Sequence, residues 1–552
     1  MSQVFPERTY PFLFVSLVLA YCLYYAPFGI NETDGGFITG LAWQVLSGKT
    51  LYHDIIYVRP PLSVWMRAME MSVLPDNWSI LGERYFFYFK VALYTWLASD
   101  LLSKGSFRWI LAMFGFVVSV HSYPACAWHT IDGILFSVVA LWLYAGPHKN
   151  MQVIGWRSGF AGVFLVGALL CKQSFYPLVV AFPLVFLLWD QPLKKQRLFW
   201  FAAGFVLSIA VFINYLHQND LLANYLQMTG SSATGGQALQ HGLLDYFRIK
   251  PALVLFSAIF LGPVTWWFLK RPKTDAAYTT WGLWLSLLLG VFVFDAWNRM
   301  EFTAPFSQSR LLFLTAVAYA FRQVTIAWKQ RETPAKQPFR LPHQTALLLL
   351  LLAISWSASV SWGYNLPIFL ATPWVFTTIE ISRTLWEAHN GKVYPKWLSV
   401  VQVILLLGIA RFSYEFVYRD SLRSSMTTNL GTIFPKLQGI YSSPEKAGLY
   451  LDVKYLQERY GPVFEILPAF PQAHFLTGTA PVLPLGWVVK REMNGNNQLV
   501  INVLKEKKPV LFIQKSFAAK IQNDPELELT RHVLETGKIL EETPHFWIVR
   551  YE

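Results

Sequence analysis

The chain has 552 residues, of which 54% are hydrophobic and 14% charged, and its formal net charge is +13. With a mean hydropathy of +0.35, this composition excludes an ordinary soluble globular protein and indicates an integral membrane protein. The excess of Lys and Arg does not indicate nucleic-acid binding, because these residues form short clusters between apolar runs, as the positive-inside rule predicts.

The first apolar run, from about Tyr10 to Ile30, follows one basic residue, Arg8. It is too long for the apolar region of a secretion signal and lacks a small-residue cleavage site, so it predicts a retained first span. Cys22, Cys126 and Cys171 lie in or beside apolar runs, without the spacing of a metal or redox site.

The first external loop is predicted to comprise residues 31–84. The stretch "NETDGG" puts Glu32 and Asp34 directly after the first span, and the helical spacing of apolar residues in "GGFITGLAWQVLSG" predicts a short helix in the plane of the membrane surface. "LYHDIIYVRPP" is expected to be extended, because a residue before proline avoids the helical region, and Pro61 then starts a second helix. This structured loop presents Asp34, His53, Asp54 and Arg59.

Further apolar runs predict about thirteen spans in all, since about 17 to 25 residues cross a bilayer. Clusters of Lys and Arg in alternate loops place the N-terminus in the cytoplasm. The same rule requires residues 158–189 to cross twice, with a tight outer turn near Cys171 to Ser174. The predicted spans after the first lie near Tyr85–Leu102, Trp109–Ser122, Ile131–Ala145, Ser158–Leu170, Phe175–Trp189, Leu198–Leu216, Ala252–Leu269, Thr280–Phe294, Thr303–Ala320, Thr345–Trp362, Leu366–Ile381 and Trp397–Ile409.

An odd number of spans places the C-terminal region outside the cell. Residues 412–552 are predicted to form an exported α/β domain that is long enough for its own core. In it, "KAGLYLDVKYLQERY" predicts a helix, and "PVFEILP", "KPVLFIQ" and "PHFWIVRY" predict strands. Residues 1–411 are then an α-helical polytopic membrane domain, whose second long external loop, residues 217–250, contains "GSSATGG".

Several features of the first loop occur together in a known family. An acidic residue after the first span, an interfacial helix, "GKTLYHD" and then "VRPPLSVW" resemble the first external loop of GT-C membrane glycosyltransferases. The resemblance is to bacterial enzymes similar to the protein O-mannosyltransferases and the aminoarabinose transferases of lipid A. With the many-span layout and the exported domain it extends over nearly the whole chain, and it implies a GT-C-like fold.

The resemblance implies transfer of a sugar from a polyprenyl phosphate carrier to a lipid, glycan or protein acceptor. The reaction takes place at the outer face of the cytoplasmic (inner) membrane. By this mapping Asp34 is the base, Arg59 contacts the carrier phosphate, and "HTIDG" supplies a second acidic residue, Asp132. Many relatives have Asp-Glu where this chain has "TDGG", so the role of Glu32 stays open.

The chemistry of this transfer requires few groups. The carrier phosphate is a good leaving group whose charge cations can stabilise, so no general acid, metal or cofactor is required. A carboxylate must take the acceptor proton on the side of the sugar opposite the phosphate, which predicts inversion at the anomeric carbon.

Other residues are candidates with simpler alternatives. Asp34 as a helix-capping carboxylate and Arg59 as a residue that extends to the membrane surface are the alternatives to their catalytic and phosphate-binding roles. Substrate contacts are predicted for His53, Asp54, His129, Gln173 and Arg310, and phosphate contacts for Lys172 and Arg299.

Two other functions compete with sugar transfer. A polytopic transporter or flippase for a lipid-linked sugar also has about a dozen spans, but the chain has no internal repeat of halves and its conspicuous ionisable residues cluster in external loops. A glycan ligase using a polyprenyl carrier is the third possibility. The sequence does not identify the sugar or the acceptor.

Overall fold

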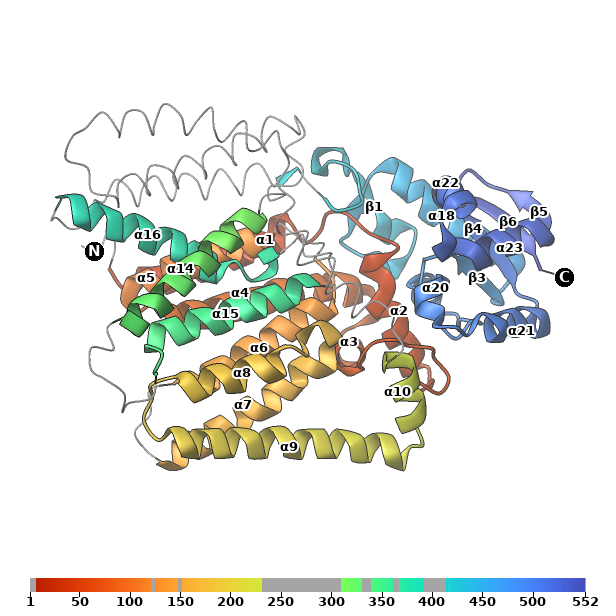
Figure 1. Cartoon of the computed structure of the whole chain (residues 1–552). Coiled ribbons are helices and arrows are strands. Elements are labelled where there is room, and N and C mark those ends of the chain that lie inside the picture. The colour runs from red at the N-terminus through yellow and green to blue at the C-terminus, as the bar shows by residue number, and fades with distance from the viewer. Residues whose placement is uncertain are drawn as a thin grey trace.

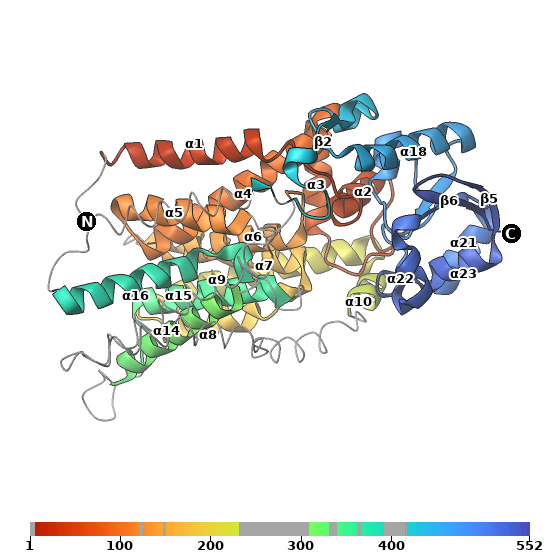
Figure 2. The same cartoon turned by 90° about the horizontal axis from the view of Figure 1, so that it is seen from above.

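The computed structural model describes residues 6–120, 125–146, 151–230, 309–329, 339–360, 367–390, 414–415 and 417–551. Long helices of the first part lie side by side along the long axis of the molecule, and the C-terminal domain (described residues 417–551) covers one end of them (Figures 1 and 2). The loop that carries α2 and α3 lies between the two parts. The predicted boundary at residues 411 and 412 lies outside the described residues.

The helices of the first part form where apolar residues run with few breakers, and they end at polar or glycine-containing turns. Their bounds are α1 Thr9–Tyr24, α2 Asp34–Leu46, α3 Leu62–Val73, α4 Ser79–Leu102, α5 Gly105–Val120, α6 His129–Ala145, α7 Met151–Cys171, α8 Leu178–Leu188, α9 Lys194–Gln218, α10 Leu222–Gly230, α14 Ser309–Lys329, α15 His343–Val360 and α16 Thr372–Asn390. Short 3₁₀ turns lie at Asp76–Trp78, Gln173–Phe175 and Pro367–Leu370.

The predicted turn within residues 158–189 is confirmed, and it joins two helices. Helix α7 ends at Cys171, the 3₁₀ turn η2 covers Gln173–Phe175, and α8 begins at Leu178. The turn therefore lies where the charge pattern predicts it.

Among the described residues, fewer helices than predicted are long and apolar enough to span a membrane. Three helices in the described part of the chain are long and apolar enough to cross a membrane, namely Val153–Cys171, Lys194–Gln218 and His343–Val360. Thr9–Tyr24, Gly105–Val120, His129–Ala145 and Gln173–Leu188 are shorter apolar helices. The count of about thirteen spans is therefore not confirmed, and the spans predicted at 252–269, 280–294 and 397–409 lie outside the described residues.

The first external loop contains both predicted helices, but α2 is enclosed on more than one side. Nine of its residues are buried, including Asp34, Thr39 and Gln44. The reason is that the C-terminal domain packs on it: a Cβ atom at Gly40 would lie 2.4 Å from the carbonyl oxygen of Pro471. The prediction of a helix lying on the membrane surface with one polar face does not include this contact.

The C-terminal domain is built on a four-stranded sheet of order β3-β4-β6-β5, with β3 and β4 parallel and the other pairs antiparallel. The predicted helix and three predicted strands are confirmed as α18, β3, β4 and β6, and β5 was not predicted. The bounds are β1 Thr428–Asn429, β2 Tyr441–Ser442, α18 Pro444–Tyr460, β3 Phe464–Leu467, α19 Ala473–Thr477, α20 Lys490–Met493, α21 Asn497–Lys507, β4 Val510–Gln514, α22 Ala518–Asn523, α23 Glu528–Thr536, β5 Lys538–Glu542 and β6 Phe546–Arg550.

Backbone hydrogen bonds join the end of the first helix to the C-terminal domain. Gly29 N–H donates to the carbonyl of Tyr441 (2.8 Å), and Tyr441 N–H donates to the carbonyl of Pro27 (2.7 Å). The Asp420 carboxylate accepts from Ile30 N–H at 2.7 Å. The segment that leads into α2 is therefore held by residues from the far end of the sequence.

Candidate active site

Asp34 is the first residue of α2, and a local turn fixes its position. Asn31 Oδ1 accepts from Thr33 N–H (2.9 Å) and Thr33 Oγ1 (2.7 Å), which shapes the chain just before the helix. The N-terminus of a helix favours a carboxylate. Asp34 nevertheless does more than cap the helix, because its side chain is only 12% exposed and has partners from a distant segment.

Those partners come from the start of the C-terminal domain. The Tyr418 hydroxyl donates to Asp34 Oδ2 at 2.8 Å, and Arg419 Nη1 lies 3.0 Å from the same oxygen. Arg419 Nη1 also donates to Thr33 Oγ1 (2.7 Å). Burial, together with the Asp34 carboxylate, raises the pKa of Tyr418. The Tyr418 hydroxyl therefore stays protonated and donates a hydrogen bond to Asp34.

Arg59 lies in the extended segment before the double proline, where the sequence predicts it. Its guanidinium binds the Glu492 carboxylate from α20 through two hydrogen bonds, Nη1 to Oε2 at 2.7 Å and Nη2 to Oε1 at 2.6 Å. The guanidinium also lies over the Phe37 ring, 5.0 Å from its centroid. A predicted phosphate ligand therefore has an acidic partner from the C-terminal domain.

Lys172 and Gln173 lie at the turn between α7 and α8. Lys172 Nζ donates to Thr130 Oγ1 at 3.1 Å, and Gln173 Nε2 donates to the carbonyl of Val58, next to Arg59, at 2.6 Å. Burial, with repulsion from Arg59, lowers the pKa of Lys172 to about 7, while Glu492 and Asp34 act in the opposite direction. Asp34, Arg59, Lys172 and Glu492 thus share one buried electrostatic site.

Asp132 is brought to a different cluster. Lys90 Nζ lies 2.8 Å from Asp132 Oδ1 and 2.9 Å from Glu70 Oε1, and Arg67 Nη2 lies 2.8 Å from Glu83 Oε2. These charges are buried and mutually compensated, as buried charges must be. The structure therefore places Asp132 with Lys90 and Glu70, and its catalytic role remains a prediction without a contact to Asp34.

The remaining predicted residues have varied environments. His129 Nε2 lies 2.5 Å from the Tyr57 hydroxyl, and Glu32 forms an ion pair with Lys446 of the C-terminal domain at 2.7 Å. His53 and Asp54 bind each other at 2.8 Å on the surface, with side chains 69% and 40% exposed. Arg299 and the side chain of Arg310, the second residue of α14, lie outside the described part of the chain.

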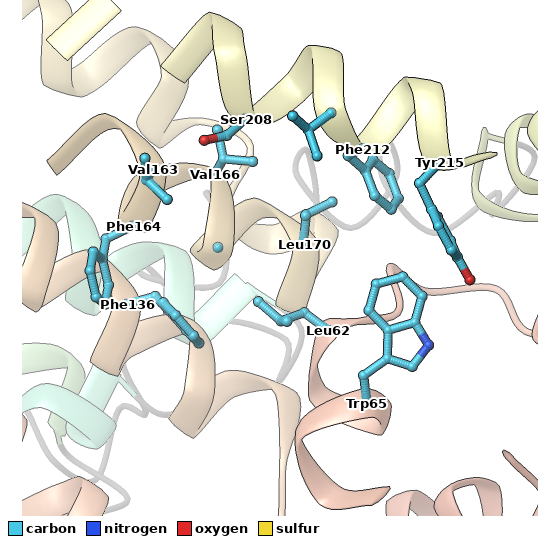
Figure 3. A pocket seen from close by; sticks show the side chains of 12 residues that line it. Leu62, Trp65, Phe136, Val163, Phe164, Val166, Leu170, Ser208, Phe212 and Tyr215 are labelled. Atoms are coloured by element: carbon cyan, nitrogen blue, oxygen red, sulfur yellow. The ribbon is translucent and has the colours of Figure 1, made fainter. Parts of the chain in front are cut away.

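An apolar groove lies between helices of the first part of the chain. It has a volume of about 620 Å³ and is formed by α3, α6, α7 and α9 (Figure 3). Leu62, Trp65, Leu170 and Phe212 line one end of it. Leu62 is three residues from Arg59, and Leu170 is two residues from Lys172. Residues that line the groove are thus close in the chain to both cations.

A smaller cavity of about 50 Å³ lies against the segment that leads into α2. Asn31, Gly35, Cys126, Tyr418 and Gln472 are among the residues that line it. The Nδ2 group of Asn31 is buried and has no hydrogen-bond partner within the described residues.

Three functional candidates escaped prediction from sequence. Glu492, Tyr418 and Arg419 reach the site from positions 384 or more residues away from their partners in the chain. Only the pattern "YRD" at Tyr418–Asp420, a charged cluster just after the last predicted span, points to a membrane-surface site. No cluster of three or more His, Cys, Asp or Glu side chains with the arrangement of a metal site occurs among the described residues.

Solved structures provide an independent comparison. The chain is similar to ArnT from Cupriavidus metallidurans bound to undecaprenyl phosphate, with a TM-score of 0.41, 11% identity and coverage of 98% of both chains. It is also similar to the oligosaccharyltransferase of Archaeoglobus fulgidus, with a TM-score of 0.48, 12% identity, and coverage of 98% of this chain and 74% of that one.

No protein-family model and no curated protein sequence matches the chain. Because the TM-scores lie below 0.5 and the identities near a tenth, the two structural similarities do not decide what the site does. The function has to be derived from the residues of the site.

Proposed function

We propose that the protein transfers a sugar from a polyprenyl phosphate carrier to an acceptor hydroxyl at the outer face of the cytoplasmic membrane. One observation carries the proposal: Arg59 and Lys172 lie in one buried site with the carboxylates of Asp34 and Glu492. An apolar groove supports it, because two of the groove's residues, Leu62 and Leu170, are three and two positions from these cations in the chain. A polyprenyl phosphate sugar has the matching order of parts, an apolar chain, an anionic phosphate and a sugar.

The groove and the cations provide for the donor. The groove is lined by apolar side chains, among them Leu62, Leu170 and Phe212. A prenyl chain that binds there is removed from water and gains dispersion contacts with these side chains. Arg59 and Lys172 then lie at the phosphate end of the chain. As the bond from the anomeric carbon to the phosphate oxygen breaks, negative charge develops on the phosphate, and the two cations stabilise it.

Asp34 provides for the acceptor. Its carboxylate accepts the proton of the acceptor hydroxyl while that oxygen forms a bond to the anomeric carbon, and the released phosphate keeps the electron pair of the broken bond. Attack from the side opposite the phosphate inverts the configuration. Tyr418 and Arg419 hold Asp34 Oδ2, so the carboxylate is fixed in direction.

An assay with Asp34→Asn tests this role. Full-length protein in lipid nanodiscs is incubated with undecaprenyl phosphate linked to radiolabelled mannose, glucose or aminoarabinose, and release of undecaprenyl phosphate is measured. We expect the wild type to release it and Asp34→Asn to be at least about 100-fold slower, since a general base contributes a factor of that order. The control is Asp76→Asn, an exposed carboxylate of the same loop, with wild-type turnover expected.

Near-normal turnover of Asp34→Asn would remove Asp34 from the role of base. Movement of an intact lipid-linked sugar across the membrane without release of undecaprenyl phosphate would instead identify a transporter.

A further inference from the structure

Arg59 is already bound by an internal anion. Both terminal nitrogens of its guanidinium donate to the two oxygens of Glu492, at 2.7 and 2.6 Å. The two side chains are only 17% and 6% exposed, so the pair is largely shielded from water. Glu492 belongs to α20, a short helix of the C-terminal domain, which lies against the first external loop (Figure 1).

A carboxylate and a phosphate compete for the same geometry. The planar guanidinium binds either group with two parallel N–H···O hydrogen bonds, so Glu492 occupies the two donors that best fit a phosphate. If a phosphate bound the remaining N–H groups instead, two buried anions would lie side by side, and their repulsion in a site of low dielectric would be large. Phosphate and Glu492 therefore exclude each other at Arg59.

The Arg59–Glu492 ion pair also compensates the buried charge of Arg59 when no carrier is bound. A buried guanidinium without a counter-charge is costly, and the bidentate carboxylate compensates its charge. Lys172, the second cation of the site, is too weakly basic to add a full charge at neutral pH, because its pKa is about 7. Glu492 is thus the counter-charge of the site in the free protein.

We propose that Glu492 is an internal competitor of the carrier phosphate, which it replaces at Arg59 whenever the phosphate leaves. The proposal rests on the proposed carrier-dependent function. The donor phosphate displaces Glu492 on entry, and after transfer Glu492 returns to Arg59 and promotes release of the spent carrier. Release needs such help, since the spent carrier is a phosphate monoester with more negative charge than the donor diester.

Binding of undecaprenyl phosphate to full-length protein in nanodiscs tests the competition. We compare the wild type with Glu492→Gln, which keeps the shape of the side chain but removes its charge. The expected result is a Kd lower by about tenfold or more, because the ligand no longer displaces a buried charge-assisted pair. The matched control is Glu528→Gln, which removes the same charge from an exposed position of the same domain and leaves the Kd unchanged.

The outcomes separate this inference from the proposed function. A Kd that is unchanged or higher in Glu492→Gln, with thermal unfolding as in the wild type, overturns the competition and makes Glu492 a residue that positions Arg59. If Glu492→Gln unfolds early, Glu492→Asp, which shortens the side chain and keeps the charge, serves as the second variant and must also lower the Kd. Binding that Lys172→Ala abolishes, with no effect of Glu492 variants, overturns the competition alone. If no variant binds undecaprenyl phosphate, the carrier site itself is wrong.

Discussion

The pKa of Lys172 depends on its burial and on the charge of neighbouring Arg59. Lys172 lies beside Arg59 in a buried position, and both effects disfavour its protonated form. Its position in the outer turn followed from the charge pattern, and Asp34, Arg59 and Gln173 were also predicted from local motifs. Glu492 and Tyr418 were not, because pairing over hundreds of residues leaves no local pattern in a single sequence.

The pKa of Lys172 predicts that binding of the proposed carrier depends on pH. The ammonium form that binds phosphate prevails below about pH 7 and is lost above it, so the protein must take up a proton to bind the carrier at higher pH. We expect the affinity for undecaprenyl phosphate to fall by up to about tenfold per pH unit between pH 7.5 and 9. The phosphate is already fully ionised in this range, since its second pKa is about 6.

Lys172→Arg tests this dependence, because arginine stays charged throughout the range. Equilibrium binding at several pH values is expected to show a flat profile for Lys172→Arg and the wild-type slope for Lys436→Arg, a lysine of the C-terminal domain outside the site. A slope that persists in Lys172→Arg would assign the titration to another group.

At the scale of elements, close contact between α7 and α9 forms the wall of the apolar groove. A Cβ atom at Gly204 would lie 2.0 Å from the carbonyl oxygen of Gly159, and one at Gly162 would lie 2.2 Å from that of Phe201. The existence of these helices was predictable from apolar runs of sufficient length. Their partners were not, because apolar composition does not specify which helices pack together.

Gly204→Ala is expected to push α9 away from α7. Overpacking of this kind costs about 1 to 3 kcal/mol, and it also distorts the groove, so both thermal stability and affinity for undecaprenyl phosphate should fall. Thermal unfolding in detergent and equilibrium binding measure the two effects. Gly159→Ala is the control, since its Cβ would meet the Trp200 carbonyl at an ordinary 3.8 Å. Equal behaviour of the two variants would contradict the tight contact at Gly204.

At the scale of the whole molecule, the site is formed by residues of the N-terminal helical part and by residues of the C-terminal domain. The sequence indicated an α/β domain and three of the four strands of its main sheet, but the predicted interfacial helix α2 did not include a contact with this domain. Hydrophobic spacing in residues 35–48 predicted one apolar face for α2, whereas the C-terminal domain covers further residues of this helix. An interface between distant segments does not alter local periodicity, so it escapes this kind of prediction.

Gly40→Ala tests whether this interface supports the site. The added methyl group would lie 2.4 Å from the Pro471 carbonyl oxygen, so residues 471–472 must move away from α2. We expect faster hydrogen exchange in α20 and reduced sugar transfer. Leu46→Ala, at the exposed end of the same helix, should leave both unchanged. Wild-type exchange in Gly40→Ala would show that the C-terminal domain docks independently of α2.

The hydrogen bonds between Tyr441 and the Pro27–Gly29 segment have a consequence for biogenesis. Ribosomes make the chain from the N-terminus, so residues 27–84 are synthesised long before residue 441. Until the last part of the chain has been made and folded, Asp34 lacks Tyr418 and Arg419, and Arg59 lacks Glu492. A nascent or prematurely terminated chain therefore has an incomplete site, and the proposed sugar transfer requires residues 418–492.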